Sequence, residues 1–435
     1  MRPILIGLML MVGLVAALLL ARPVASGLEQ PTPVAFGGGA VDPGALDEMS
    51  PDERAAIMAM LNANIVWLTS QGRLAAPLAT ERVALGWPLA PRAGFNDPGY
   101  FGVTGYMDHN PAFPGQVRDY TCGRRTYDSS AGYNHQGTDY FLWPFAWNKM
   151  AAGDVRVVAA ADGVIVGRRE GNPDQSCGSG GQWNAVYVRH ADGSIAWYGH
   201  LKRDSLTAKP IGAAVSRGEY LGLVGSSGNS GGPHLHFELY APGGQLIDPY
   251  GGSCNPLDGG GWWETQREYY DAAVNKLMTG TAAVERGTCP APDVTHEATQ
   301  FQPGDRITFT TFYRDQLSSL PSVYRIIAPN GAVYAQWSHS SATAHMPLSY
   351  WYWTYNFPTT AQTGTWHFEV TFNGRTDTHS FVIGQPSTAT PTPTPSLTPT
   401  PSATPTITPT PTPSITPTPW YPTDFVFVPA VTNDE

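Results

Sequence analysis

The amino-acid sequence predicts a mainly β protein with two separate β-rich regions and a short helical segment near the N-terminus. Short runs of β-branched and aromatic residues recur between Asp-Gly and Asn-Gly turns, which is typical of antiparallel strands. Hydrophobic residues make up 42% of the 435 residues, enough for more than one core. The formal net charge of −10 argues against nucleic acid as a partner, because nucleic-acid binding needs a basic face.

Residues 1–26 are expected to be an export signal. Arg2 provides a positive start, residues 4–20 are apolar, and Val24-Ala-Ser26 offers small residues for cleavage. An uncleaved membrane anchor is the alternative, because the apolar stretch is about long enough to cross a bilayer. No other run of spanning length follows, so we expect no stable membrane span in the mature chain and a secreted or cell-surface location.

Residues 27–95 are expected to form an N-terminal helical segment. Ser50 is a suitable capping residue, and a proline and two acidic residues follow it directly, as at many helix starts. Hydrophobic residues then recur at helical spacing as far as Leu68, which predicts one amphipathic helix over residues 51–70. The segment is either a packing element or a pro-region, and the sequence leaves both open.

Residues 96–255 are expected to form an antiparallel β-sheet domain. Six short strands are predicted there, over residues 154–160, 163–166, 185–189, 194–198, 220–224 and 234–240. A glycine- and serine-rich loop over residues 225–232 precedes the last strand, and residues 169–182 are expected to form a long surface loop.

A connecting helix is expected within residues 256–289, over Trp262–Met278, and a second β domain over residues 290–384. About seven short strands fit a β-sandwich of immunoglobulin-like size there. Four aromatic residues share one face of its most aromatic strand: Trp351, Trp353, Tyr355 and Phe357. They are either a platform on which a glycan would stack or part of the sandwich core, and large aromatic residues at a period of two are more often core.

Residues 385–420 are Pro/Thr-rich and predict an extended linker, because such a composition cannot bury a core and favours polyproline II. Residues 421–435 form a C-terminal tail with the short apolar run Phe425-Val-Phe-Val-Pro429, which is too short to cross a membrane. No role is assigned to this tail.

The four cysteines, Cys122, Cys177, Cys254 and Cys289, suggest two disulfides in an exported protein, and three pairings are open. We favour Cys122–Cys177 with Cys254–Cys289, because the first two flank the candidate site. Free buried thiols are the alternative. The spacing is too wide for a structural zinc site built on a CxxC pair.

Four histidines and one aspartate are candidate residues of a metal site. His135 and Asp139 lie four residues apart around Gly137, a spacing that indicates little by itself. His234 and His236 lie two apart in a predicted strand, so both imidazoles face the same side. His200 ends another predicted strand. Together these residues are the ligand types that a catalytic zinc site uses.

Three segments carry a family resemblance: His135-Gln-Gly-Thr-Asp139, Tyr198-Gly-His200-Leu201, and Gly225-Ser-Ser-Gly-Asn-Ser-Gly-Gly-Pro-His-Leu-His-Phe-Glu238. Residues 120–250 thereby resemble the lysostaphin-type, LytM-like zinc endopeptidases of bacterial cell-wall turnover. The resemblance covers roughly a third of the chain. It implies a small antiparallel sheet with a groove, and one zinc ion per chain on the floor of that groove.

Carried over by position, the resemblance implies that His135, Asp139 and His236 bind the zinc ion, and that His200 and His234 are the catalytic histidines beside it. Three protein ligands leave one coordination position open, as in catalytic zinc sites. The resemblance does not say which of the two histidines is the general base. Glu238 is either a carboxylate that orients a ligand or an ordinary groove residue.

The sequence departs from the family pattern in two places. The aromatic run Tyr140–Trp147 replaces a short Ala/Pro-rich turn, and the loop over residues 169–182 is enlarged. Both are expected to line the groove. His190, before an Asp-Gly turn, is expected at the surface, and His109 is given no role.

The favoured hypothesis is an exported zinc endopeptidase that cleaves peptide bonds in peptidoglycan stems or cross-bridges. One alternative is a catalytically silent envelope protein that binds the cell wall or activates another hydrolase. Another is a surface adhesin that acts through the β-sandwich, where a glycan contact would also lie. The sequence does not indicate which bond is cut.

Overall fold

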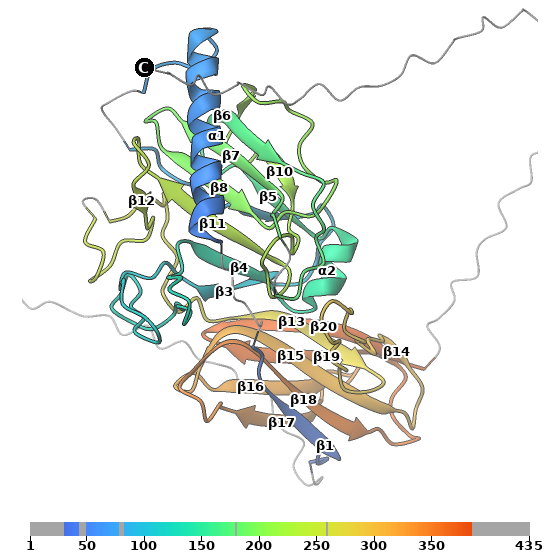
Figure 1. Ribbon diagram of the computed structural model, residues 1–435. Helices are drawn as coiled ribbons and strands as arrows, with labels where there is room; N and C mark the ends of the chain where they lie inside the picture. The colour runs from blue at the N-terminus through green and yellow to red at the C-terminus, as the bar shows by residue number, and fades with distance from the viewer. Residues whose placement is uncertain (1–29, 43–48, 78–81, 179–180, 258–259, 385–435) are drawn as a thin grey trace, which may run out of the picture. The chain divides into compact units, whose positions relative to one another are not determined.

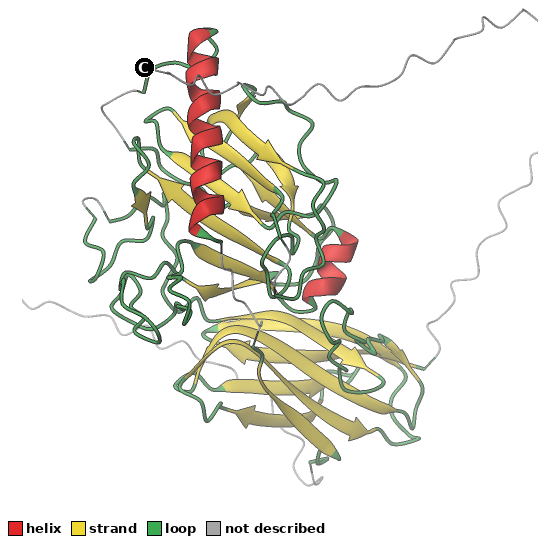
Figure 2. Cartoon of the chain, viewed as in Figure 1, coloured by secondary structure: helices red, strands yellow, loops and turns green. Residues whose placement is uncertain are grey.

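The computed structural model describes residues 30–42, 49–77, 82–178, 181–257 and 260–384. Within these ranges strands predominate and only two helices occur, α1 (Pro51–Ser70) and α2 (Ala146–Ala152) (Figures 1 and 2). Almost all strand pairs are antiparallel, and the short pair of β14 and β20 is parallel. The prediction of a mainly β chain with a short N-terminal helix is therefore confirmed.

One large sheet carries the candidate site residues. Its strands follow the order β3-β4-β11-β8-β7-β6-β9, and β12 pairs with β11. They are β3 (Phe101–Gly105), β4 (Thr138–Leu142), β6 (Gly163–Arg169), β7 (Ala185–His190), β8 (Ile195–Gly199), β9 (Ala214–Val215), β11 (His234–Tyr240) and β12 (Leu246–Ile247). The strands predicted from β-branched and aromatic runs are found at nearly the expected bounds.

A smaller sheet shares a core with the large one. Its order is β10-β5-β2, made of β2 (Leu89–Pro91), β5 (Val155–Val158) and β10 (Tyr220–Leu223). Val157 of the small sheet lies in one cluster of buried residues with Leu235 and Phe237 of β11. These two residues are on the face of β11 that is turned away from His234 and His236, so the hydrophobic face of the strand is fixed by the core.

Two further sheets enclose a second core (Figure 1). One has the order β1-β18-β15-β13 and the other β14-β20-β19-β16-β17. Their strands are β1 (Ala35–Ala40), β13 (Ala273–Gly280), β14 (Gln300–Phe301), β15 (Arg306–Leu317), β16 (Ser322–Ile327), β17 (Val333–His339), β18 (His345–Asn356), β19 (Gly364–Phe372) and β20 (Arg375–Ile383). Seven of these nine strands lie in residues 290–384, as expected, while the immunoglobulin-like assignment stays a prediction.

The aromatic strand face of β18 belongs to this second core. Trp353, Tyr355 and Phe357 are buried, and Trp351 is half-buried against the same cluster. The ring of Trp353 lies 4.5 Å from that of Tyr324 on the opposite sheet. Of the two readings of this face, core and glycan platform, the packing supports the core, because buried rings are not available for a sugar to stack on.

Helix α1 begins as the sequence predicts. The Ser50 side chain accepts a hydrogen bond from the Glu53 backbone N–H, which caps the first turn. Its buried residues Ile57, Leu61 and Leu68 pack in a third cluster with aromatic residues of the large sheet, including Trp197 and Tyr240. Tyr240 follows the two histidines on the same face of β11, so α1 covers part of the sheet face that holds the candidate site.

The prediction of a helix over Trp262–Met278 is wrong, because residues 273–280 form strand β13. Val274 and Leu277, three residues apart, both face the second core, which mimics helical spacing. The register of β13 against β15 shifts between Val274 and Lys276. Such a β-bulge inserts an extra residue and reverses the alternation of faces, so this segment lacks the regular period of two by which a strand is recognised.

The favoured disulfide pairing is also wrong, although the number of bonds is as expected. The bonds are Cys122–Cys254 and Cys177–Cys289, and no described cysteine is free. Each joins residues more than a hundred positions apart in the sequence. Proximity to the candidate site in the sequence therefore did not indicate the partner, since the fold brings distant loops together.

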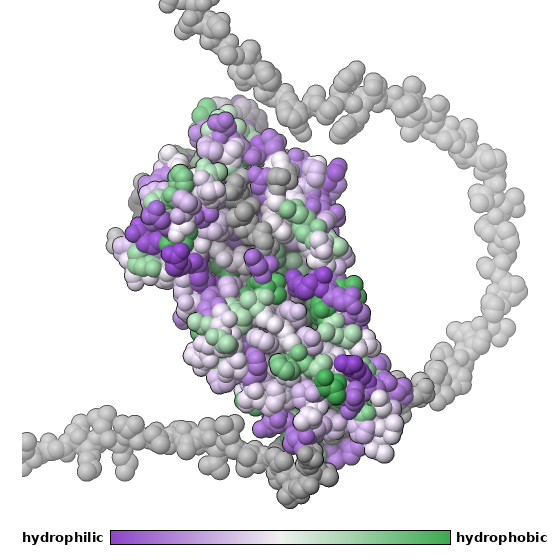
Figure 3. All heavy atoms as spheres, turned by 60° about the horizontal axis from the view of Figure 1, so that its bottom comes forward, coloured by the Kyte–Doolittle hydropathy of each residue, from purple (hydrophilic) through white to green (hydrophobic). Residues whose placement is uncertain are grey.

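Three expectations fall on residues outside those that the structure describes: the export signal, the Pro/Thr-rich linker and the C-terminal tail. Among the described residues, no helix is both long enough and apolar enough to span a membrane. On the face shown in Figure 3, hydrophobic residues are scattered in small groups among polar ones.

Candidate metal and catalytic site

The candidate site is built on β11, whose side chains alternate between a hydrophobic core and a polar face. His234, His236 and Glu238 share the polar face, as the period of two requires. In the ladder with β4, His236 lies directly opposite Asp139, and in the ladder with β8 it lies opposite Gly199. Residues far apart in the sequence are thus brought together by strand pairing alone.

Three of the predicted residues converge on one point. His135 Nε2 lies 3.2 Å from Asp139 Oδ2, and His236 Nδ1 lies 2.9 Å from Asp139 Oδ1. The two imidazole nitrogens are 3.4 Å apart. Nitrogen and carboxylate donors within 4.8 Å of one another can share a single metal ion, and two imidazoles with one carboxylate suit zinc.

The remaining atoms of these side chains are held by other groups. His135 Nδ1 lies 2.7 Å from the carbonyl oxygen of Tyr106, and His236 Nε2 lies 2.8 Å from Glu238 Oε1. Contacts of this kind fix which ring nitrogen carries the proton and leave the other nitrogen as a metal ligand. The donor set therefore fits a bound zinc ion.

The two other predicted histidines lie beside this cluster. His200 follows the end of β8 with a left-handed backbone (φ 59°), and its ring centroid is 4.4 Å from that of His234. The Nδ1 atoms of both rings lie against carbonyl oxygens of the loop over residues 225–232, at 2.6 Å from Ser227 for His200 and 2.8 Å from Gly232 for His234. This loop thus orients both rings and leaves Nε2 as the atom that faces away from it.

A second donor set shares one residue with the first. His200, His234 and His236 also offer ligand atoms within 4.8 Å of one another. The first set differs in containing the carboxylate of Asp139, which adds a negative charge to balance the cation. The geometry brings together all five residues singled out in the sequence, and the roles of the individual residues remain predictions.

The charge of the site is set by two buried carboxylates. Burial by itself would raise the pKa of Asp139, but the nearby imidazoles of His135 and His234 outweigh it and lower the pKa well below the ordinary value. Burial likewise opposes ionisation of Glu238, but Arg54 and His236 lower the pKa of Glu238 to about 2. Both side chains are therefore anionic at neutral pH.

Two residues at the site were missed in the sequence. The hydroxyl group of Tyr127 donates a hydrogen bond to Asp139 Oδ2 at 3.1 Å, and its ring stacks on His135 at 4.3 Å between centroids. Arg54 of α1 pairs with Glu238. Neither residue lies in a motif, and Arg54 is remote in sequence, so no local signal could have identified them.

Some expectations about the surroundings are corrected. His190 is buried, not at the surface, and its Nδ1 lies 2.8 Å from the Asp162 carbonyl oxygen. His109 pairs with Asp248 at 2.8 Å. Neither belongs to the metal-ligand groups found among the described residues.

Two residues of the aromatic run Tyr140–Trp147 pack against the second β region. Trp143 and Phe145 pack edge-on against Phe312 of β15, with centroids 5.7 and 4.9 Å away. The indole N–H of Trp143 donates to the carbonyl oxygen of Tyr313. The expectation that this run lines the groove is therefore wrong for these two residues, whereas the ring of Phe141 stacks on His234 at 6.0 Å.

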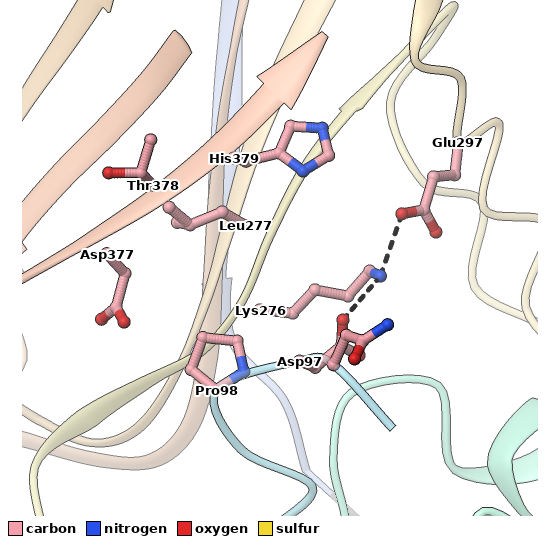
Figure 4. Close-up of a pocket in the computed structure, with 9 residues that line it drawn as sticks. Asp97, Pro98, Lys276, Leu277, Glu297, Asp377, Thr378 and His379 are labelled. Carbon is pink, nitrogen blue, oxygen red and sulfur yellow. Dashed lines mark hydrogen bonds and ion pairs between the residues drawn. The ribbon is translucent and has the colours of Figure 1, made fainter. Parts of the chain in front are cut away.

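A separate polar cavity of about 210 Å³ is lined by none of the five candidate site residues and lies between the residues before β3 and strands β13 and β20 (Figure 4). Lys276 lies between two carboxylates there, with Nζ 3.1 Å from Asp97 Oδ1 and 2.9 Å from Glu297 Oε1. Lys149 Nζ also lies 3.3 Å from Asp97 Oδ2, so two ammonium groups balance these two carboxylates, and the cavity supports no ligand assignment.

Comparison with known proteins agrees with the geometry of the site. Residues 134–249 match the model of Peptidase family M23 and contain all five site residues. This part of the chain is therefore a peptidase family M23 domain, which confirms the resemblance to lysostaphin-type endopeptidases.

Two relatives show how far the similarity extends. The DD-carboxypeptidase/endopeptidase Mpg of Neisseria meningitidis is 38% identical over 117 residues, which are 26% of this chain and 22% of that protein. The peptidoglycan DD-endopeptidase ShyC of Vibrio cholerae is 32% identical over 109 residues, 25% of this chain and 21% of that protein. The chain thus spans about a fifth of the length of these relatives.

Among solved structures, the catalytic domain of lysostaphin from Staphylococcus simulans is 25% identical. The match covers 33% of this chain and 86% of that domain, with a TM-score of 0.21.

Proposed function

We propose that this protein is an exported zinc metalloendopeptidase that hydrolyses peptide bonds in peptidoglycan stems or cross-bridges. The observation that carries the proposal is the convergence of His135 Nε2, the Asp139 carboxylate and His236 Nδ1 within 4.8 Å. His200 and His234 lie next to this group with their rings oriented by loop carbonyls. Metal ligands beside oriented imidazoles are what metal-assisted hydrolysis requires.

In this proposal His135, Asp139 and His236 hold the zinc ion. When bound, zinc acts as a Lewis acid that polarises a carbonyl group and lowers the pKa of a water molecule at its open position. His200 and His234 move or hold protons at Nε2, because Nδ1 of each ring is engaged by a backbone carbonyl. The carbonyl contacts keep both rings in place while the reaction proceeds.

The choice of substrate rests on the relatives. Both proteins reported above are named as endopeptidases, and the name of the Vibrio protein specifies peptidoglycan. The N-terminal sequence fits export to the compartment in which peptidoglycan is found. The peptide part of peptidoglycan is therefore the proposed substrate.

Access to the site is restricted in this structure. The side chains of His135, Asp139, His234 and His236 have no exposed surface, and His200 has an exposed fraction of only 1%. A polymeric substrate cannot touch these atoms in this arrangement. We therefore infer that the chain around the site rearranges when substrate binds.

Substitution of His236 tests the metal site. His236→Ala removes a ligand, so it should abolish stoichiometric zinc binding and reduce hydrolysis of purified peptidoglycan by at least about a thousandfold, with the chelator-treated wild type behaving in the same way. His367→Ala, which removes a histidine bonded to Ser380 on the second β region, is the matched control and should change neither property. Zinc content is measured by elemental analysis and hydrolysis by mass spectrometry of released muropeptides.

Substitution of His234 separates the two donor sets. His234→Ala should keep one zinc ion per chain and lose most of its turnover, because it removes a proton-handling group and not a ligand. Loss of zinc in this variant would show that the set containing His200, His234 and His236 binds the metal instead. An unchanged rate in His236→Ala would reject the proposed function.

A further inference from the structure

An ion pair joins the N-terminal helix to the strand that carries the candidate metal ligand His236. Arg54 contacts both carboxylate oxygens of Glu238, with Nη1–Oε2 at 2.5 Å and Nη2–Oε1 at 3.0 Å. The exposed fraction is 14% for the Arg54 side chain and zero for Glu238. A buried two-point contact of this kind fixes the orientation of a carboxylate in a way that an exposed ion pair does not.

The same carboxylate touches the metal ligand. Glu238 Oε1 lies 2.8 Å from His236 Nε2, on the opposite side of the ring from the atoms that face Asp139. A carboxylate can only accept, so Nε2 must carry the proton and donate it. When zinc is bound, Nδ1, which lies 2.9 Å from Asp139 Oδ1 and 3.4 Å from His135 Nε2, would supply the lone pair, while Nε2 keeps the proton that Glu238 accepts.

The orientation of Glu238 depends on its other partners. Oε2 accepts from Arg54 and from the Tyr240 hydroxyl group at 2.6 Å, while Oε1 is shared by Arg54 and His236. Arg54 is the partner that contacts both oxygens, so it sets the plane of the carboxylate. Without it, Glu238 is a buried anion that can rotate away from His236.

We propose that Arg54 is a positioning residue for the metal centre: through Glu238 it holds His236 in the Nε2–H form and orientation that bind zinc. The proposal rests on the proposed function, since it concerns the same metal site. It assigns to helix α1 a supporting role in the site. A chain that lacks this helix is accordingly expected to bind zinc more weakly.

Helix α1 has other attachments that survive the loss of Arg54. Ile57, Leu61 and Leu68 are buried against the large sheet. Glu53, the neighbour of Arg54, pairs with Arg169 of β6 at 3.0 Å. This second pair also ties α1 to the sheet but makes no contact with Glu238 in the described chain, so Arg169→Met is the matched control.

The test measures zinc affinity in the full chain by competition with a chromophoric chelator. Arg54→Met should weaken zinc binding by roughly tenfold or more, the range found when groups that orient metal ligands are removed. Arg54→Lys keeps the charge without the two-point contact and should lie between wild type and Arg54→Met. Arg169→Met should match the wild type.

A second measurement needs no metal. In the zinc-free protein, nitrogen NMR shifts of histidine report which ring nitrogen is protonated. In the wild type and Arg169→Met, Nε2 of His236 should be protonated because it donates to Glu238, and in Arg54→Met the protonated fraction of Nε2 should fall. If Arg54→Met does not fold, Arg54→Lys carries the test on its own.

Several outcomes overturn the proposal. Wild-type zinc affinity in Arg54→Met, or in Arg54→Lys where only that variant folds, removes the role assigned to Arg54. An equal loss of zinc affinity in Arg54→Met and Arg169→Met shows that zinc binding depends on the docking of helix α1 and not on the contact between Arg54 and Glu238. If the wild type itself binds no zinc, the proposed function fails first, and the NMR comparison still decides whether Arg54 sets the form of His236.

Discussion

Asp119 organises the loop that carries Cys122, and it does so from a fully buried position. Its Oδ1 accepts hydrogen bonds from the backbone N–H groups of Thr121 and Gly123, and its Oδ2 accepts from the backbone N–H of Arg125 and the hydroxyl group of Tyr269. Burial would raise the pKa of Asp119, but these hydrogen bonds outweigh it and lower the pKa below its ordinary value of 3.8.

We expect Asp119→Asn to lower the free energy of unfolding at pH 7 by about 1–3 kcal/mol, because an amide cannot accept from all of these donors. The folded-state pKa lies below the unfolded one, so the wild-type advantage is complete above pH 3.8 and is lost as the pH falls through the folded-state pKa. Urea unfolding at pH 7 and at pH 3 measures the difference in free energy of unfolding between the wild type and Asp119→Asn. A difference that does not shrink at pH 3 would contradict it.

At the residue scale, the strand pattern and the motifs together predicted five residues that the fold brings close to one another, while their roles remain predictions. His234 and His236 share a face through the period of two, and this needs no knowledge of the fold. The contacts of Tyr127 with Asp139 and of Arg54 with Glu238 depend on the path of distant segments. Such contacts are set by tertiary packing, so no local pattern predicts them.

At the scale of elements, the disulfide Cys177–Cys289 stabilises the loop that orients the two candidate catalytic histidines. Gly178, next to Cys177, exchanges two backbone hydrogen bonds with Ser230 of that loop. The Cys289 sulfur lies 3.8 Å from the Gly231 carbonyl oxygen. The loop in turn supplies the carbonyl groups that accept from the two rings.

The double variant Cys177→Ser, Cys289→Ser is expected to lose about 2–4 kcal/mol of stability and most of its hydrolytic rate. The matched control is Cys122→Ser, Cys254→Ser, which opens a similar loop, with a sequence separation of 132 against 112. The control should lose similar stability but keep more activity, because the Cys122–Cys254 bond does not contact the loop over residues 225–232 that orients the two histidines. Thermal unfolding and muropeptide release measure the two effects. Equal activity losses would argue against this role for the loop.

The elements that the sequence predicted correctly are those with a regular hydrophobic period. Helix α1 has a capping serine and a helical repeat, and the strands of the large sheet alternate between Gly-containing turns. Strand β13 was not predicted, because its bulge puts Val274 and Leu277 on the same face and interrupts the alternation that marks a strand. A bulge depends on the partner strand, which the sequence does not reveal.

At the scale of the whole molecule, the N-terminal segment takes part in both β regions. Strand β1 pairs with β18 at the edge of one sheet, and α1 packs on the sheet that holds the candidate site. The sequence predicted two β regions but treated residues 27–95 as a separate segment. It could not predict β1, because Ala35-Phe-Gly-Gly-Gly-Ala40 has poor strand propensity and gains its structure from β18.

Removal of β1 should expose the edge of β18 and promote self-association, because an unpaired edge strand is a template for other chains. Gly38→Val should act in the same way at full length, since Gly38 has φ +131° and an added Cβ would lie 2.1 Å from the Tyr350 carbonyl oxygen. Size-exclusion chromatography with light scattering compares a chain starting at residue 43, Gly38→Val and the wild type. Two variants that stay monomeric with unchanged melting temperatures would contradict this expectation.

The pairing of β1 with β18 also bears on the order of events during translation. Ala35 leaves the ribosome before residues 134–249, which match peptidase family M23, whereas its partner Thr354 is made only after them. Domains tend to fold as they emerge, N-terminal parts first. Here β1 must wait until nearly all of the described chain has been synthesised before it can join its sheet.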